Sequence, residues 1–504
     1  MDGDIMSYTL KNKIYGIHWP KTSPSVVNRT HDAIGMIAGV GLDTNASYNQ
    51  FDTAQIYDQI QTVTDSYGNS FVRIPKFYIK KWSGENYYAK AVSLSPISGG
   101  YLPWCFWDFT NSKELPYIDI GCYLGSRDGS NFMESKSGEY PERSLSIVSW
   151  RTAAELNNTG GLLGYQQMDA HAWDAIQTLM DVEFATFDIQ AIMTGYTAGR
   201  YASTDLLTAN TSSNTLQTTN TIAGYYEVGQ YIGVGTSQGG FERFYSRKIT
   251  NIEVDTPSAG QATITYDGTP SVDCYIGDYL QNSPWINGWS SVMKASSGGI
   301  GNLTDGKWPM MWRGIENVYG NVYQWCDGIN IDGGSTWVDT TDYYIGDLVI
   351  GWDGAAGTDD VYICTADHTS AADTRPSSGA SYATVWENLN GRQAWVCKDA
   401  DDYVSNLFGS PYEKLSYVNA PTNSWIQNEG YDSSLPFCNL PDVVSGTSTY
   451  LRDYYYQSTG ARVALVGGRL SGGSDAGLRC WALYGSSSLT SWSIGGRLLK
   501  KALI

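Results

Sequence analysis

The sequence lacks any run of about eighteen consecutive apolar residues, the length that a membrane-spanning helix needs. Its first residues, MDGDIMSYTLKNK, contain no basic stretch followed by an apolar run, so a secretory signal peptide is not expected either. Long Lys/Arg runs are also missing, and 32 basic residues against 51 acidic ones give a formal net charge of −19. Because nucleic acids and anionic membranes are bound through basic patches, neither is expected as a partner.

Residue patterns that carry catalysis are scarce. The four histidines, His18, His31, His171 and His368, share no spacing that would place two of them on one helix face. The chain therefore lacks histidines at a spacing that favours a zinc site or a histidine-based triad, and structural roles are expected for these four residues. The sequence contains no Walker phosphate loop, GxGxxG fingerprint or HExxH motif. No catalytic residue, metal ligand or cofactor is predicted, although the many Asp and Glu residues leave a glycosidase pair open.

Cysteine is too rare for a disulfide-held scaffold, with eight in 504 residues and none in a CxxC pair. Most are expected to be buried thiols, while an occasional disulfide and the redox compartment stay open. Hydrophobic residues make up 42% of the chain, aromatic residues 13% and charged residues only 16%. This composition is typical of a folded chain rich in strands and turns, and the length predicts several domains or one core with large insertions.

Two helices are expected. Ser149 is predicted to cap SWRTAAELNN, and Asp169 is predicted to cap AHAWDAIQTLMDVEFA, where apolar residues recur at helical spacing. Elsewhere short apolar runs alternate with polar turns. In FVRIPKFYIKKW, Val72 and Ile74 share one strand face, and Pro75 is expected to end the ladder.

Two β-rich insertions are predicted in the second half of the chain. In residues 228–282 apolar and polar residues alternate, as is typical of a small all-β insertion. Residues 336–390 contain two strand-like runs between Trp337 and Trp386. Loops of such length usually carry function or structure of their own.

Three segments, taken in order, resemble the formylglycine-generating-enzyme type of C-type-lectin fold: LSIVSWRTAAELNN, WRGIENVYGNVYQWCDG and the closing ARVALVGGRLSGGSDAGLRCWALYGSSSLTSWSIGGRLL. The resemblance implies an α+β, C-type-lectin-like domain over residues 61–504, interrupted by the two insertions and preceded by an N-terminal segment, residues 1–60. Gly320 and Asn321 are interpreted as a structural turn above Trp325. The enzyme branch of this fold needs two nearby cysteines in the closing segment, where Cys480 stands alone, so formylglycine generation is not expected.

The sequence is more similar still to the variable proteins of diversity-generating retroelements, especially those like the tail-fibre proteins of gut bacteriophages. VRIPKFYIK, the long insertion before WRGIENVYGNVYQ and the glycine-rich closing segment carry this resemblance. It implies that residues 461–504 form a hypervariable segment that binds a ligand. Arg479, Cys480 and Trp492 depart from the residues usual in that family. The ligand-binding positions that the resemblance implies are Arg469, Ser471, Gly472, Asp475, Arg479, Ala482, Tyr484, Gly485, Leu489, Ser491, Trp492 and Ser493.

The residue types of the closing segment agree with a rigid frame that carries a changeable face. Arg, Tyr and Trp are the residues that dominate binding hot spots, although Trp481 is equally well explained as a core residue. Glycines permit close backbone approach and positive φ, and apolar residues between them supply anchors. The expected frame consists of Gly467, Gly468, Gly473, Gly477, Gly495 and Gly496 with Ala476, Leu478, Leu483 and Ile494.

The module at residues 336–390 resembles a small chitin-binding-type carbohydrate module. The resemblance implies that Trp352, Tyr362 and Trp386 stack on sugars. A purely structural role stays open, because a module this small needs the same aromatic residues to build its core.

The sequence thus predicts a non-enzymatic receptor-binding protein of a phage tail, located in the virion. Its expected partners are a bacterial surface protein or glycan and other tail proteins, and an oligomer such as a trimer stays open. One alternative is an adhesin on the bacterial cell surface that uses the same variable face. A less favoured alternative is an enzyme of the formylglycine-generating type or a glycosidase.

Overall fold

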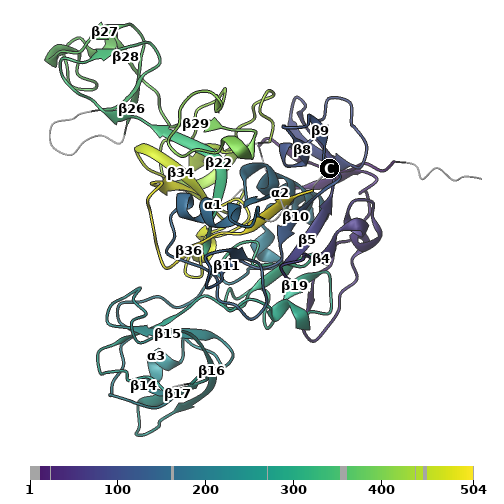
Figure 1. The fold of residues 1–504 in the computed structure, drawn as a ribbon, viewed down its shortest axis with the longest axis vertical. Helices are drawn as coiled ribbons and strands as arrows, with labels where there is room; N and C mark the ends of the chain where they lie inside the picture. Colours follow the sequence, from purple (N-terminus) through teal and green to yellow (C-terminus); the bar gives the residue numbers. More distant parts are fainter. Residues whose placement is uncertain are drawn as a thin grey trace, which may run out of the picture.

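The computed structural model describes residues 12–22, 24–159, 164–269, 271–351, 360–437, 439–446 and 451–502. It shows a β-rich mixed fold, with 35% of the chain in strands and 12% in helices. Figure 1 shows a central body and two smaller β lobes that project from it, one around β14 to β17 and the other around β26 to β28.

The longest helix, α2 (Ala170–Phe184), lies inside the body, and all 15 of its residues are buried. Asp169 caps it, as the sequence predicts, because its Oδ1 accepts a hydrogen bond from Ala172 N at 2.9 Å. A helix that is buried on every side is typical of the interior of a large core.

Helix α1 (Ile147–Glu155) begins earlier than the sequence pattern suggests. Its N-cap is Ser146, whose hydroxyl accepts a hydrogen bond from Ser149 N at 3.2 Å, so the prediction that Ser149 is the cap is wrong. Both serines fit a capping pattern, but the earlier start places Ile147 and Trp150 on the buried side of the helix. One further α-helix in the described residues, α3 (Asn220–Ala223), is a single turn.

Three carboxylates of α2 are buried, and each is neutralised by a cation from another part of the chain. A buried charge is costly unless it is paired, so these contacts determine which segments can lie against the helix. The pairs are Asp174 with Lys81 at 2.7 Å, Asp181 with Lys90 at 2.6 Å and with Arg479 at 2.5 Å, and Glu183 with Arg313 at 2.8 Å.

Three of the sheets in the body have four or five strands, and Pro75 ends one of these strands as predicted. The first sheet has the order β2 (Asn28–His31), β1 (Tyr15–Pro20), β7 (Tyr87–Ser93) and β6 (Tyr78–Ser83). The second has the order β13 (Tyr165–Gln167), β37 (Leu498–Lys501), β10 (Tyr117–Gly121), β5 (Ser70–Pro75) and β4 (Gln61–Thr64). The third has the order β21 (Ile315–Glu316), β20 (Met310–Trp312), β19 (Ser297–Gly299) and β3 (Gly41–Leu42). Two short pairs are β8 (Trp107–Asp108) with β9 (Lys113–Glu114) and β11 (Ser126–Arg127) with β12 (Met133–Glu134).

The largest sheet of the body has nine strands. Eight of them follow the order β30 (Glu413–Lys414), β29 (Gln393–Val396), β22 (Tyr323–Gly333), β34 (Gly460–Val466), β35 (Trp481–Gly485), β33 (Tyr454–Gln457), β31 (Ser424–Glu429) and β32 (Pro441–Ser445), and β36 (Ile494–Gly495) pairs with β22.

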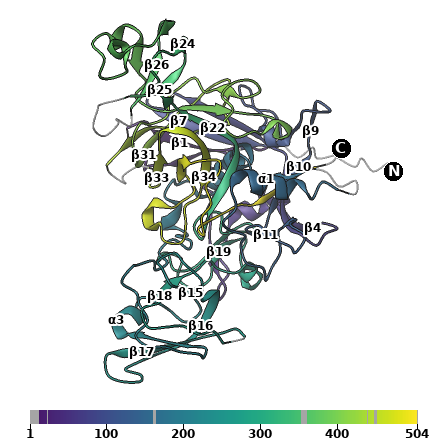
Figure 2. The same ribbon diagram turned by 60° about the vertical axis from the view of Figure 1, so that its left-hand side comes forward.

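The closing segment of the chain is built into these sheets. Strand β34 lies antiparallel between β22 and β35, and β37 lies antiparallel between β10 and β13. Figure 2 shows the yellow strand β34 inside the body, beside β22. Residues 461–502 are therefore an integral part of the body and not a separate domain.

The turn before β22 is structural, which confirms its interpretation from the sequence. Asn321 is fully buried at a φ of +60°, and its Oδ1 accepts a hydrogen bond from Trp285 N at 2.9 Å. Trp325 is also fully buried, and its indole N–H donates to Leu145 O at 3.0 Å.

The first lobe has a core of its own, which includes Leu216, Ile232, Ile249 and Ile264. Its sheet begins before residue 228, because β14 is the antiparallel partner of β17. The strand order is β14 (Thr215–Thr219), β17 (Gln261–Tyr266), β16 (Phe244–Val254), β15 (Tyr231–Gly235) and β18 (Tyr279–Asn282).

The second lobe leaves the body after β22 and returns at β29. These two strands are antiparallel neighbours, with Asp332 opposite Gln393, so the two ends of the lobe lie side by side. The lobe contains one sheet, β23 (Ser335–Thr336), β25 (Leu348–Ile350), β26 (Val361–Cys364) and β28 (Trp386–Asn388), and one pair, β24 (Asp342–Tyr343) with β27 (His368–Thr369).

Replacement of residues 337–390 by a short Gly/Ser linker should leave the body folded. The pairing of β22 with β29 supplies the closure, and a flexible loop adds little entropy cost. We expect a cooperative thermal transition close to that of the parent, measured by circular dichroism and calorimetry. Loss of cooperative unfolding would contradict this. A matched linker in place of residues 323–333, which removes β22 itself, should abolish the transition.

Candidate binding surface

The frame of the closing segment depends on close backbone packing. Gly468 has a φ of +74°, and a Cβ built on it would lie 2.4 Å from the Cβ of Ala476, a contact that no side chain tolerates. The apolar residues between the glycines are buried, with exposed fractions of 0 or 1%. These anchors are Ala476, Leu478, Leu483 and Ile494.

The structure separates the implied ligand-binding residues into two groups. One group is partly exposed on the loops after β34 and β35 and at the end of β35: Arg469, Ser471, Gly472, Asp475, Tyr484, Leu489, Ser491 and Trp492. The other group is buried: Arg479, Ala482, Gly485 and Ser493. These four residues do not reach the surface, so the expectation that they contact a ligand is wrong.

Arg479 is the clearest correction, because its side chain is completely buried in a charge network. Its Nη2 lies 2.5 Å from Asp181 Oδ2, and its Nε lies 3.4 Å from Glu429 Oε1. Its backbone N–H donates to Asp453 Oδ2 at 2.5 Å. Although burial opposes the charge, Asp181 and Glu429 raise the pKa of Arg479, whereas burial raises the pKa of Asp453 well above its usual range. Arg479 is thus a structural cation.

The other three buried positions face the interior of the sheet. Ala482 has no exposed surface and belongs to a core cluster with Trp325. A Cβ on Gly485 would lie 3.5 Å from the Trp325 ring, and Ser493 is 3% exposed. Trp481 is also 3% exposed, which favours its interpretation as a core residue.

Trp492 lies at the joint between the body and the first lobe. Its ring centroid is 5.3 Å from that of Tyr201 and 5.4 Å from that of Phe241. The Arg469 guanidinium lies 5.4 Å from the Tyr201 ring and 6.0 Å from the Trp492 ring. Trp492 therefore packs the lobe against the body in addition to being partly exposed. Tyr201 and Phe241 are contacts that no local sequence pattern indicates.

A row of aromatic rings crosses the large sheet beside the exposed positions. Neighbouring ring centroids are 4.7 to 6.5 Å apart, and all rings except that of Tyr323 are partly exposed. Burial and a hydrogen bond to Asp475 Oδ2 at 2.7 Å raise the pKa of Tyr456, which keeps its phenol protonated as the donor. The row consists of Trp425, Tyr454, Tyr456, Tyr484 and Tyr323. Trp425, Tyr454 and Tyr456 were not expected from the sequence, and the run YYYQ of β33 is the signal that could have indicated two of them.

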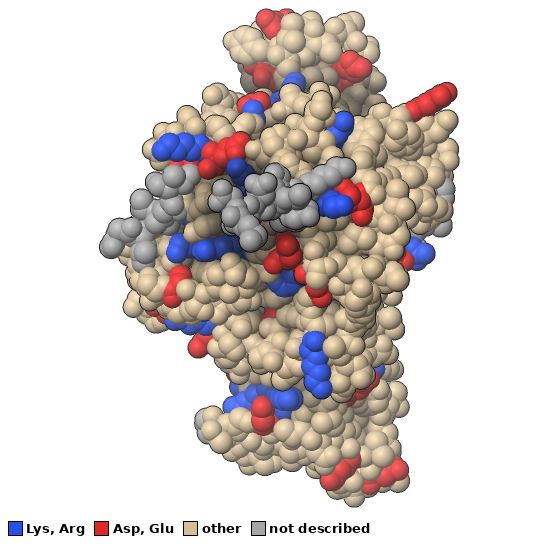
Figure 3. Space-filling view, turned by 90° about the vertical axis from the view of Figure 1, so that its right-hand side faces the viewer, with Lys and Arg blue, Asp and Glu red and all other residues tan. Residues whose placement is uncertain are grey.

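The exposed group and the aromatic row together form what we call the C-terminal surface. Its side chains are mainly aromatic and hydroxyl-bearing, with one cation, Arg469, and one carboxylate, Asp475. A surface of this composition suits recognition by ring contacts and short hydrogen bonds rather than by charge. Figure 3 shows another face, the right-hand side of Figure 1, on which Lys and Arg are interspersed with Asp and Glu over a largely uncharged surface.

The aromatic residues of the second lobe form its core. Trp386 is 2% and Tyr362 is 6% exposed, so neither presents a ring face for a sugar, and the sugar-stacking expectation is wrong for both. The Trp386 centroid lies 5.1 Å from that of Tyr343 and 5.2 Å from that of His368. A lobe of this size needs these rings for its own stability. Trp352 lies outside the described residues.

Candidate catalytic groups are few in the described part of the chain. Seven cysteines there are buried, and burial raises the pKa of the Cys480 thiol well above its usual range. Within the described ranges, no group of three or more His, Cys, Asp or Glu side chains is arranged to hold a metal ion.

None of the helices that the structure describes has both the length and the apolar character needed to cross a membrane.

Comparison with models of known protein families finds no match, and comparison with curated proteins finds none either.

Substitution of Arg479 by Ala should lower the free energy of unfolding by about 3 to 5 kcal/mol, because it removes a buried cation from Glu429 and leaves Asp181 with Lys90 alone. The matched control is Arg452→Ala, since Arg452 also pairs with an aspartate, Asp188, at 3.4 Å but its side chain is 50% exposed. That change should cost no more than about 1 kcal/mol. Urea denaturation measures both. Equal losses would contradict the role assigned to Arg479.

Proposed function

We propose that the chain is a non-enzymatic, ligand-binding protein with a C-type-lectin-like fold of the formylglycine-generating-enzyme subtype. In this proposal it belongs to the variable proteins of diversity-generating retroelements. It acts at the tail of a phage, where its C-terminal surface recognises a protein or glycan on a bacterial cell.

One observation carries the proposal: frame and surface are physically separate within a single short segment. The anchors Leu483 and Ile494 are buried, while Tyr484 and Trp492, adjacent to them in sequence or nearly so, are partly exposed. Exposed positions can change with little effect on stability, whereas changes at buried anchors leave cavities. A segment of this kind tolerates diversification of its surface, as the proposed function requires.

The composition of the C-terminal surface also supports binding. Tyrosine and tryptophan supply large contact areas at low conformational cost, and serines supply adaptable hydrogen bonds. Arg469 adds a cation beside two rings, a residue type that is enriched in binding hot spots. The same combination is typical of antibody paratopes, which must also accept sequence change.

Two alternatives differ in location or chemistry. A bacterial surface adhesin would use the same surface, and identification of the protein in purified virions distinguishes it from a tail protein. An enzyme of the formylglycine-generating type would need a reactive thiol. The burial of Cys480 and the raised pKa of its thiol favour binding over that chemistry.

Binding and stability should respond to different substitutions. Arg469→Ala and Tyr484→Ala remove surface groups, so each should weaken adhesion of the labelled protein to its bacterial host by about thirty-fold, equivalent to roughly 2 kcal/mol. Ile494→Ala removes an anchor and should cost about 2 to 5 kcal/mol of stability. Adhesion is measured by flow cytometry on a panel of gut bacterial isolates, and stability by thermal unfolding.

Trp492→Ala should affect both properties, because its ring contacts the first lobe as well as solvent. The natural control is Val443→Ala, since Val443 lies on β32 and is 50% exposed. It should alter neither adhesion nor melting temperature. Unchanged adhesion in both Arg469→Ala and Tyr484→Ala would remove the C-terminal surface from the binding site.

A further inference from the structure

Two arginines lie on aromatic rings at the joint between the C-terminal surface and the first lobe. Arg469, from the loop after β34, lies 6.0 Å from the Trp492 ring. Arg143, from the segment before α1, lies 3.8 Å from the Tyr245 ring and 5.5 Å from that of Phe241. Because the Phe241 ring is 5.4 Å from that of Trp492, ring contacts connect the two arginines. We call this set the joint cluster: Arg143, Tyr201, Phe241, Tyr245, Arg469 and Trp492.

Neither arginine of the joint cluster forms an ion pair with a carboxylate in the part of the chain that the structure describes. The carboxylates beside the cluster in the sequence have partners of their own. Glu142 pairs with Arg127 at 3.3 Å, and Glu242 accepts a hydrogen bond from a backbone N–H at 2.8 Å. Asp475, the carboxylate of the C-terminal surface, accepts one from Tyr456. Although the chain has a net charge of −19, the joint therefore carries two cations that no described carboxylate pairs with.

The N–H donors of the joint cluster are open to solvent. Trp492 Nε1 makes no hydrogen bond within the described residues, and Arg469 makes a single long one, from Nη1 to Ser493 Oγ at 3.5 Å. No nitrogen of Trp492, Arg469 or Arg143 is among the buried side-chain atoms that lack a hydrogen-bond partner, so the nitrogens without a partner are accessible. A ring against the flat side of a guanidinium fixes its plane and leaves its N–H groups free. Open donors beside positive charge suit an anion.

The rings of the joint cluster add flat apolar surface next to these donors. The Trp492 ring lies 5.3 Å from that of Tyr201 and 5.4 Å from that of Phe241, and all three rings are partly exposed. Each comes from a different loop. A peptide is usually held along a strand edge or in an apolar groove, whereas ring faces and planar donors match the C–H face and the acidic group of a charged sugar.

We propose that the joint cluster binds an anionic glycan. The carboxylate or phosphate group of an acidic sugar unit accepts hydrogen bonds from the Arg143 or Arg469 guanidinium, while the C–H face of a sugar ring packs on Trp492 or Phe241. This inference rests on the proposed function, because Arg469 and Trp492 belong to the C-terminal surface, and it names the chemical class of the ligand. Arg143, Tyr201 and Phe241 lie outside residues 461–504, so the site joins residues of the closing segment to residues from the rest of the chain.

The test measures binding of acidic sugars to the full-length protein by calorimetry and saturation-transfer NMR. The probes are trigalacturonate, N-acetylneuraminate and mannose phosphate, each paired with a neutral form of the same sugar: the methyl esters of the first two, and mannose. At least one acidic probe should bind with a Kd on the order of 1 mM, and its neutral form about ten-fold more weakly. Added NaCl should weaken the binding, because salt screens exposed charges. The preferred probe distinguishes a carboxylate from a phosphate.

Variants locate the site. Arg143→Ala and Arg469→Ala should each weaken binding of the acidic probe about ten-fold, with a melting temperature close to that of the parent. Arg143→Lys, which keeps the charge, should bind more tightly than Arg143→Ala. If Arg143→Ala does not fold, Arg469→Ala and the comparison with the neutral forms still test the proposal.

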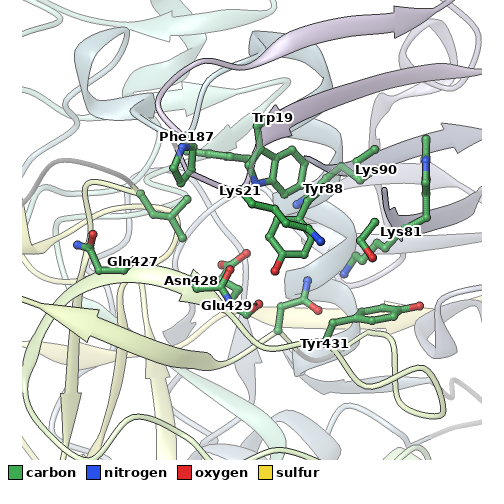
Figure 4. Close-up of a pocket in the computed structure, with 16 residues that line it drawn as sticks. Trp19, Lys21, Lys81, Tyr88, Lys90, Phe187, Gln427, Asn428, Glu429 and Tyr431 are labelled. Atoms are coloured by element: carbon green, nitrogen blue, oxygen red, sulfur yellow. Dashed lines mark hydrogen bonds between the residues drawn. The ribbon is translucent and has the colours of Figure 1, made fainter. Parts of the chain in front are cut away.

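The matched control is Lys21→Ala. Lys21 also lies over a ring, with its Nζ 5.1 Å from the Tyr88 centroid, and it forms no ion pair within the described residues. It lines a pocket of about 110 Å³ together with Trp19 and Glu429, and no residue of the joint cluster takes part in that lining (Figure 4). Lys21→Ala should therefore bind the acidic probe like the parent.

Absence of saturable binding by all three acidic probes would overturn the proposal. Binding that Lys21→Ala abolishes and Arg143→Ala leaves intact would also overturn it, since the anion site would then be the other pocket. Tighter binding of a polyglutamate peptide than of any acidic sugar would overturn the choice of a glycan.

The adhesion assay separates this inference from the proposed function. Loss of adhesion in Arg469→Ala and Tyr484→Ala, without binding of any acidic probe, would overturn the anionic glycan and leave the proposed function standing. Binding of an acidic probe that depends on Arg143, with adhesion unchanged in both variants, would support the site and remove the proposed role in adhesion.

Discussion

Helix α2 carries Asp174, Asp181 and Glu183 into the interior of the body, and each of these carboxylates needs a cation there. The cations come from β6, from β7, from the loop after β20 and from the segment between β34 and β35. Movement of any one of these segments away from the helix would separate a buried carboxylate from a cation that pairs with it. The ion pairs around α2 therefore hold segments that are distant in the sequence against this helix, in addition to the apolar contacts of the core. The C-terminal segment takes part in this arrangement through Arg479, which explains how its two surface loops can be held on a rigid base.

Some features could be predicted from sequence because their causes are local. The helical spacing and the cap at Asp169 predicted α2, and the alternation of glycines with apolar residues predicted the buried anchors of the closing segment. Other features could not, because their causes are distant in sequence. Arg479 has the residue type of a binding hot spot, but its partners Asp181 and Glu429 come from α2 and β31. Trp492 likewise meets Phe241 only because a loop of the first lobe contacts the body.

The two lobes differ in how they connect to the body and contact it. The second lobe joins two adjacent strands, and its aromatic residues turn inward to form a core of their own. The first lobe also has its own core, but it contacts the body through Tyr201 and Phe241, which pack on Trp492. A ligand that occupies the C-terminal surface near Trp492 would therefore also meet the first lobe. The pocket beneath Trp19 and Tyr88 lies against the same charge network from another side, since Glu429 belongs to both.

The position of β37 between β10 and β13 has a consequence for biosynthesis. Strands β10 and β13 leave the ribosome long before β37, and they cannot complete their sheet until it arrives. The body therefore cannot close until β37 has been made, and non-local pairing of this kind is slow. Under the proposed function, a diversified sequence whose frame does not fit would prevent the whole body from closing. Misfit variants would then be removed as unfolded chains before they could be assembled, so that the fold itself acts as a quality filter on the repertoire.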